Sequence, residues 1–349
     1  MRILRILLAP ILLSAWLPAY AQIETDSAMA TVPVADTISS PEEYSDLAYW
    51  VGVLASDSLR GRANGTADLD SAASFIATWY DSLGLAPVPG MDSFMQDYTV
   101  RNTVEGQNVV GWLEGSDSIL KDEYIILSAH YDHVGMGKAI GGDSLYNGAN
   151  DNASGVATIM AIAKEIQERE MKPARSLLFV AFGAEEIGLL GSKYFSEHSP
   201  VPLENVALNL NFEMTGHSLK LGKRNVYITG AKYSELKEYM EGEFEDENWT
   251  LIENPFPYAN LFYRSDNANL AQIKREGETI YGIPAHTVCT WGGEDHYHKP
   301  HDEAAFIDYE NMRSLAMVMT DVVLGLANRE ERIKWTDDKF RPLAKEGAE

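Results

Sequence analysis

Short apolar runs alternate with longer amphipathic stretches through the middle of the chain. Runs 124–129, 176–182 and 206–211 are short and predominantly apolar, which predicts buried strands. Stretches 153–168 and 186–198 repeat apolar positions with the period of a helix. Strands that alternate with helices in this way pair in parallel and carry the helices over the sheet. The pattern therefore predicts an α/β fold.

The flanking sequence predicts further elements by the same criteria. We expect helices at 41–54, 66–83, 233–242, 266–274 and 310–327. We expect strands at 94–100, 108–113, 226–229 and 285–289, the first two of them as a hairpin.

The first 21 residues have the parts of a secretory signal. Arg2 and Arg5 precede an apolar run at 6–17, and small residues at 19 and 21 form a cleavage site. The run is shorter than the roughly 20 residues that span a bilayer. We therefore expect residues 1–21 to be a cleaved signal peptide rather than a membrane anchor, with export to a periplasm or out of the cell. We expect no stable membrane insertion.

Composition divides the remainder of the chain. Residues 22–40 are polar and lack periodicity, which predicts a flexible leader, and 41–327 form the folded domain. Residues 328–349 are highly charged and predict a solvated tail. The formal net charge of −24 disfavours nucleic acid as a partner. The single cysteine, Cys289, excludes an intramolecular disulfide and predicts a buried small side chain rather than a nucleophile.

Side chains able to bind metals follow three predicted strands directly. His130 and Asp132 follow the first strand. Glu185 and Glu186 follow the second, and Glu213 follows the third. Because the carboxyl ends of parallel strands meet at one edge of a sheet, these side chains are expected on a common rim.

Two loops add further ligands. Asp151 lies after a glycine-rich loop, just before the helix at 153–168, and His298 lies among three histidines that follow the last strand. Mixed nitrogen and oxygen ligands suit zinc, and their number suffices for two ions with a bridging carboxylate. Taken singly, the paired glutamates also fit a solvated helix N-terminus, and the loop histidines a solvated surface.

These motifs resemble metallopeptidase family twenty-eight, the zinc exopeptidases that include bacterial leucyl aminopeptidase, aminopeptidase Y, glutamate carboxypeptidase II and glutaminyl cyclase. The resemblance covers roughly residues 42 to 326. It opens with LASDSLRGR at 54–62 and closes with YHKPHD at 297–302, with the strand-end motifs in order between them. It implies one domain, a three-layer sandwich with a mixed, mostly parallel sheet between helices.

The resemblance also implies a role for each ligand. His130 and Glu213 would bind the first zinc. Glu186 and His298 would bind the second, and Asp151 would bridge both ions through a residue whose following peptide bond is cis.

Three further acids take supporting roles in the resemblance. Glu185 would be the general base. Asp132 would orient His130, as metal-bound histidines generally require, and Asp302 would orient His298. The histidines that match no ligand position are His133, His296 and His301.

Two positions depart from the family pattern. Glu213 stands where the family usually has Asp, which places full occupancy of the first zinc in question. Asn267 stands where the family often has His. Nearby Tyr263 and Arg264 are candidates to line the substrate pocket.

The function implied by the resemblance is a di-zinc aminopeptidase. It would hydrolyse N-terminal residues from peptide or aminoacyl substrates by a metal-bound hydroxide, with Glu185 as general base. A glutaminyl cyclase of the same fold would use one zinc, which a weak site at Glu213 favours. A carboxypeptidase would need cations such as Arg264 and Lys299. A non-catalytic binding module is disfavoured because every ligand position holds a metal-competent side chain.

Overall fold

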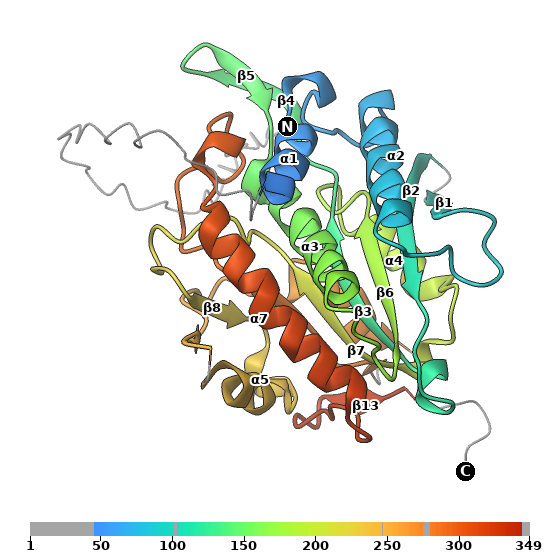
Figure 1. Ribbon diagram of the computed structural model, residues 1–349. Helices are drawn as coiled ribbons and strands as arrows, with labels where there is room; N and C mark the ends of the chain where they lie inside the picture. Colours follow the sequence, from blue (N-terminus) through green and yellow to red (C-terminus); the bar gives the residue numbers. More distant parts are fainter. Residues whose placement is uncertain (1–44, 101–102, 246, 275–279, 344–349) are drawn as a thin grey trace, which may run out of the picture. The chain divides into compact units, whose positions relative to one another are not determined.

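An eight-stranded sheet, in the order β1-β2-β6-β3-β7-β12-β8-β9, organises the computed structural model (Figure 1). The four inner strands β6, β3, β7 and β12 are parallel. Strands β1 and β2 form an antiparallel hairpin, and antiparallel pairs also join β2 to β6 and β12 to β8. The strands are β1 (Met95–Val100), β2 (Val104–Leu113), β3 (Tyr124–His130), β6 (Ser176–Phe182), β7 (Val206–Phe212), β8 (Asn225–Ile228), β9 (Thr250–Leu251) and β12 (Ala285–Cys289). The structure describes residues 45–100, 103–245, 247–274 and 280–343.

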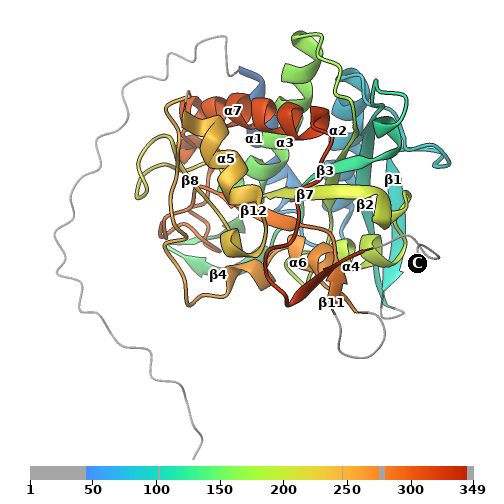
Figure 2. The ribbon, with the colours of Figure 1, turned by 90° about the horizontal axis from the view of Figure 1, so that it is seen from below.

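Helices cover both faces of this sheet. Helices α1, α2, α3 and α7 lie over one face, and α4 and α6 lie over the other (Figure 2). Helix α5 packs beside α7. The helices are α1 (Ser45–Leu54), α2 (Ala67–Ser82), α3 (Ser154–Glu168), α4 (Leu190–Glu197), α5 (Leu236–Glu245), α6 (Asn267–Ala271) and α7 (Tyr309–Asn328). The predicted three-layer α/β sandwich is confirmed.

Alternating side chains of the central strands supply two separate cores. In β3, Ile125 and Leu127 face the core beneath the four-helix layer, whereas Ile126 faces the opposite core. In β6, Phe179 and Val180 divide in the same way. A strand with both faces buried needs apolar residues at consecutive positions. This requirement explains why the predicted strands are continuous apolar runs.

Some predicted boundaries are wrong for local reasons. Helix α4 begins at Leu190 rather than at Glu186, because Ala184 and Leu189 take left-handed backbone angles, with φ of 56° and 58°. Helix α6 ends at Ala271, where a short strand, β10 (Ile273–Lys274), replaces its expected continuation. The glycine-rich loop contains an unpredicted hairpin of β4 (Gly135–Ile140) and β5 (Asp143–Tyr146).

The expected solvated tail is wrong for residues 333–343. Ile333, Phe340 and Leu343 are buried. Strand β13 (Phe340–Pro342) pairs in parallel with β11 (Ile280–Gly282). Phe340 and Leu343 therefore extend the core opposite the four-helix layer, and Ile333 joins the core beneath that layer. Residues 344–349, the predicted signal peptide at 1–21 and the leader at 22–40 lie outside the described residues.

Within the described ranges, no helix combines the length and apolar character needed to cross a membrane.

Candidate metal centre

Three neighbouring parallel strands deliver the candidate ligands to one edge of the sheet. Strand β3 ends at His130, and Glu185 and Glu186 lie in the turn after β6. Glu213 directly follows β7. Because these strands are adjacent in the order β6-β3-β7, their carboxyl ends bring all four side chains to the same rim, as the sequence predicted.

Asp151 reaches this rim from the segment Ala149–Ala153, which leads into α3. The peptide bond from Asp151 to Asn152 is cis, as the resemblance implied. The Asn152 side-chain amide donates to the Phe212 carbonyl at 2.9 Å, and its oxygen accepts from the Met214 amide at 3.0 Å. These bonds tie the Asp151 segment to the end of β7, beside Glu213.

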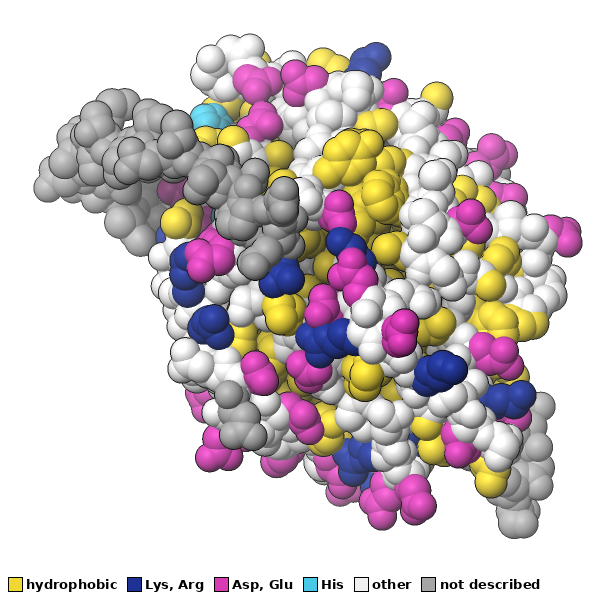
Figure 3. Space-filling model, viewed as in Figure 1, with side chains coloured by type: hydrophobic (Ala, Val, Ile, Leu, Met, Phe, Trp, Pro, Cys, Tyr) yellow, Lys and Arg dark blue, Asp and Glu magenta, His cyan; other side chains and the backbone are white. Residues whose placement is uncertain are grey.

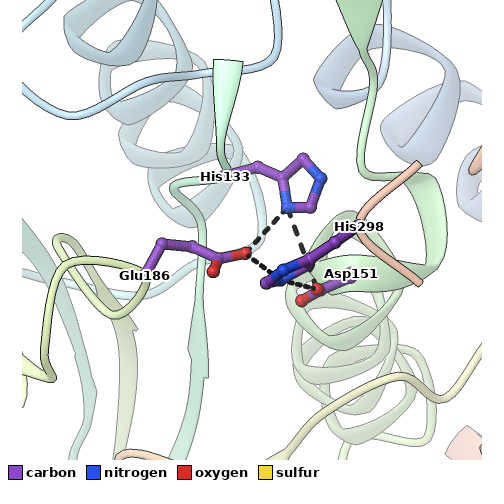
Figure 4. Close-up of side chains that lie close together, drawn as sticks. All are labelled: His133, Asp151, Glu186 and His298. Atoms are coloured by element: carbon purple, nitrogen blue, oxygen red, sulfur yellow. Dashed lines mark hydrogen bonds and ion pairs between the residues drawn. The ribbon is translucent and has the colours of Figure 1, made fainter. Parts of the chain in front are cut away.

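Four side chains form one cluster of ligand atoms. His133, Asp151, Glu186 and His298 each offer an atom, and these atoms all lie within 4.8 Å of one another (Figure 4). His298 Nε2 is 3.1 Å from Asp151 Oδ2 and 3.0 Å from Glu186 Oε1. We name this set the second group.

A first group lies on the other side of Asp151. It consists of His130, Glu185 and Glu213, whose ligand atoms also lie within 4.8 Å of one another. His130 Nε2 is 3.2 Å from Asp151 Oδ1, whereas His298 contacts Oδ2. Asp151 thus presents one oxygen to each group, the placement that a bridging carboxylate requires.

Buried polar atoms indicate that the two groups fit cations. His130 Nε2 and Asp151 Oδ2 are buried, and neither makes a hydrogen bond of good geometry within the described part of the chain. Buried polar atoms in proteins are normally hydrogen-bonded, so orphaned ones need another partner. Imidazole and carboxylate donors of this kind suit zinc.

Burial also shifts the acids of the first group. Desolvation raises the pKa of Glu185 well above its usual value, and repulsion from Glu213 adds to this effect although His130 opposes it. Desolvation likewise raises the pKa of Glu213 to about 7, despite His130 and a hydrogen bond from Ser265 Oγ. Crowded, desolvated carboxylates of this kind are stabilised as anions by a cation between them.

Asp132 supports both groups from beneath. Its two carboxylate oxygens accept from the backbone amides of Glu185 at 3.0 Å and Glu186 at 3.2 Å. Its Oδ1 also lies 3.6 Å from His130 Nδ1. The side chain therefore fixes the turn after β6 and faces the imidazole that it was expected to orient.

Asp302 differs from its expected role. Its carboxylate oxygens accept from the backbone amides of Asn150 at 2.8 Å and Asp151 at 2.9 Å, rather than orienting His298. It thereby holds the Asp151 segment in place, although the two residues are 151 positions apart in the sequence.

Arg62 holds the surrounding loops together. Its buried guanidinium donates to the carbonyls of Tyr131 at 2.7 Å, Asn147 at 2.7 Å and Gly148 at 2.9 Å. It also donates to the Leu54 carbonyl. Tyr131 adjoins His130, and Asn147 and Gly148 lead toward Asp151. Arg62, at the end of the LASDSLRGR motif, therefore ties together the two segments that carry these side chains.

His133 is the ligand candidate that the sequence interpretation missed. The signal was its position three residues after His130, beyond the end of a buried strand. The other two unmatched histidines lie outside both groups: His296 contacts His217, with ring nitrogens 3.5 Å apart, and His301 is exposed. Asn267 is buried in a structural role, accepting from Thr287 Oγ1 at 2.9 Å.

A cavity of about 140 Å³ adjoins the first group. Glu213 and Arg264 both line it, whereas Tyr263 is not among the lining residues. Aromatic side chains dominate the remaining wall: Tyr227, Phe256, Trp291 and Tyr297. Cys289 also lines the cavity, and burial raises the pKa of its thiol to about 12, which fits the expected inert side chain.

The inner strands of the sheet are parallel, and candidate histidine and carboxylate ligands lie at their carboxyl ends. This arrangement is typical of α/β metalloproteins. A sequence model of peptidase family M28 matches residues 108–323, and the chain belongs to this family. It is 25% identical over 250 residues to aminopeptidase YwaD of Bacillus subtilis, covering 68% of this chain and 48% of the relative. It is 26% identical to leupeptin-inactivating enzyme 1 of Streptomyces exfoliatus, covering 56% and 40%. The chain thus spans about half or less of the length of these curated relatives.

Solved structures share the fold. BSAP, a zinc aminopeptidase from Bacillus subtilis, matches with a TM-score of 0.62 and 17% identity, over 83% of this chain and 96% of that chain. The LapA aminopeptidase of Legionella pneumophila matches with a TM-score of 0.60 and 19% identity, over 83% and 75%.

Proposed function

We propose that this protein is a di-zinc aminopeptidase that removes N-terminal residues from peptides. The observation that carries the proposal is the placement of Asp151, which offers one oxygen to His130 and the other to His298. His130, Asp151 and Glu213 would hold the first ion, and the second group would hold the second. Bound zinc would supply Lewis acidity and lower the pKa of a water toward neutrality.

Glu185 is the acid of the first group that this ligand assignment leaves free. Its desolvated carboxylate has a raised pKa, which suits a group that accepts a proton from the attacking water. The same carboxyl then delivers the proton to the departing amine. Asp132 accepts a hydrogen bond from the backbone amide of Glu185 and so holds the proposed base beside the proposed ligands.

The aromatic cavity beside Glu213 provides a place for the side chain of the N-terminal residue. Its apolar wall supports burial of an aliphatic or aromatic side chain. A carboxypeptidase would need several cations for a free carboxylate. Arg264 is the only Lys or Arg among the described residues lining this cavity, which favours the aminopeptidase.

Glu213 supports a second candidate, a one-zinc glutaminyl cyclase. Its carboxyl, with a pKa of about 7, accepts a hydrogen bond from Ser265 Oγ and is therefore less available to a metal than an unpaired aspartate.

We also propose that the protein is exported by means of a cleaved signal peptide at residues 1–21. N-terminal sequencing of the mature protein tests this proposal.

Elemental analysis combined with a substrate panel separates these functions. We expect close to two zinc ions per chain and release of the arylamine from aminoacyl arylamides. One zinc with conversion of N-terminal glutamine to pyroglutamate would establish the cyclase instead. Zinc-loaded protein without turnover on any peptide or aminoacyl arylamide would reject the aminopeptidase.

A further inference from the structure

We propose that His133 is a fourth protein ligand of the second metal position, which closes that site and leaves the open coordination position at the first. The inference rests on the proposed di-zinc centre but concerns how the two positions differ. The four side chains involved approach from separate segments and point toward one another in Figure 4.

The spacing of the ligand atoms fits four-coordinate zinc. A tetrahedral site with bonds of about 2.0–2.2 Å places its ligand atoms roughly 3.3–3.6 Å apart. His133 Nδ1 lies 2.9 Å from Glu186 Oε1 and 3.9 Å from Asp151 Oδ2. His298 Nε2 lies 3.0 Å and 3.1 Å from the same two oxygens. These separations scatter around the tetrahedral value.

The fold holds the His133 ring in this place. Its side chain is fully buried, and its backbone amide donates to the Arg62 carbonyl at 3.1 Å. Gly148, with a φ of +63°, packs against the ring, because a Cβ there would lie 2.5 Å from His133 Cγ. The opening left by Gly148 lets the imidazole turn Nδ1 toward the second group.

The two metal positions would therefore differ in kind. The second has four protein ligands, which is typical of a closed structural zinc site. The first has His130, Glu213 and a shared Asp151, with Glu185 beside it, which is typical of a catalytic site that keeps a position for water or substrate. We expect the second ion to be retained and the first to exchange.

X-ray absorption of protein loaded with one equivalent of zinc tests this inference, since the method counts imidazole ligands. We expect two imidazoles on the retained ion in the wild type and one in His133→Ala. Competition with a chromophoric chelator should show at least a 100-fold loss of affinity at the tight site in the variant. His198→Ala, at an exposed histidine stacked on Tyr194, is the matched control and should change neither measurement.

A single imidazole in the wild type would overturn the inference, because His133 would then only hydrogen-bond Glu186. That result leaves the aminopeptidase proposal intact if two equivalents of zinc still support turnover. The wild-type count decides the question even if His133→Ala fails to fold. Absence of zinc binding altogether would instead reject the proposed function.

Discussion

Glu185 and Glu186 are adjacent in the chain but have opposite surroundings. Glu186 Oε1 contacts His133 and His298, and these contacts lower its pKa although burial and Asp151 oppose the shift. Glu185 is desolvated beside Glu213, which raises its pKa although His130 opposes the shift. These opposite environments fit the proposed roles of Glu186 as a metal ligand and of Glu185 as the group that accepts the proton.

Replacement of Glu185 by Gln tests this separation. The amide keeps the size of the side chain but cannot accept a proton, so turnover should fall about 10²–10⁴-fold. The metal content should be unchanged, because the proposed ligands remain. Turnover on an aminoacyl arylamide and elemental analysis of the same sample measure the two effects.

Glu197→Gln is the control, since this glutamate is exposed on α4 and contacts neither group. It should retain full turnover. Activity of Glu185→Gln within tenfold of the wild type would contradict a role as general base.

The candidate ligands were predictable from the sequence to an unequal degree. His130, Glu186 and Glu213 follow buried strands, so topology alone placed them on one edge. His133 was missed because its nitrogen reaches Glu186 only through the packing of Gly148 and Arg62, which strand periodicity does not encode. The role of Asp302 was also misassigned, since its partners are backbone amides rather than a side chain.

Between elements, the Arg62 side chain joins loops that the sheet does not connect. Replacing Arg62 by Met would leave four buried carbonyls without this donor, and each such loss costs about 1–3 kcal/mol. We expect the free energy of unfolding to fall by roughly 4 kcal/mol or more. Urea denaturation of metal-free protein measures this change.

Arg60→Met is the matched control because Arg60 is exposed and its guanidinium contacts only the Met136 sulfur, at 3.5 Å, within the described residues. Its effect should stay within about 0.5 kcal/mol. Equal losses in the two variants would mean that the buried contacts of Arg62 contribute nothing specific.

Elements with two buried faces were predicted best. The bounds of β6 and β12 agree with the predicted runs, because uninterrupted apolar residues leave no other assignment. The hairpin of β4 and β5 was missed because most of β4 is exposed and carries no apolar alternation. Strand β13 was missed because its three residues include one buried side chain, Phe340, among charged neighbours.

At the scale of the whole molecule, the charged side chains can be followed on one face. Acidic and basic side chains are interspersed on the face shown in Figure 3, and the acids account for the net charge of −24. Buried ionisable groups whose pKa values are shifted by folding make the free energy of unfolding depend on pH.

His286 illustrates this dependence away from the metal centre. Burial lowers its pKa to about 4, although a hydrogen bond to the Thr229 carbonyl opposes the shift, and its Nε2 lies 2.7 Å from Ser234 Oγ. In the unfolded chain His286 takes up a proton near pH 6.5, whereas in the folded protein it does so only near pH 4. The free energy of unfolding is therefore highest above pH 6.5 and falls as the pH drops toward 4. At pH 5.0 the loss is about 2 kcal/mol.

The test compares wild type with His286→Gln by urea denaturation in chelator at pH 7.5 and pH 5.0. The variant should be less stable at pH 7.5, and the difference should narrow by about 2 kcal/mol at pH 5.0. His198→Gln provides an exposed control with no such change. A difference that is constant with pH would show that His286 is not neutral in the folded protein.

The contact of Asp302 with the backbone at Asn150 and Asp151 joins residues 152 and 151 positions apart. A nascent chain exposes His130 and Asp151 to solvent long before His298 and Asp302 leave the ribosome. Neither the Asp151 segment nor His298 can take its final place until nearly the entire domain has been synthesised. We therefore expect the proposed cations to be bound late in maturation, and a product truncated before residue 298 to lack the proposed activity.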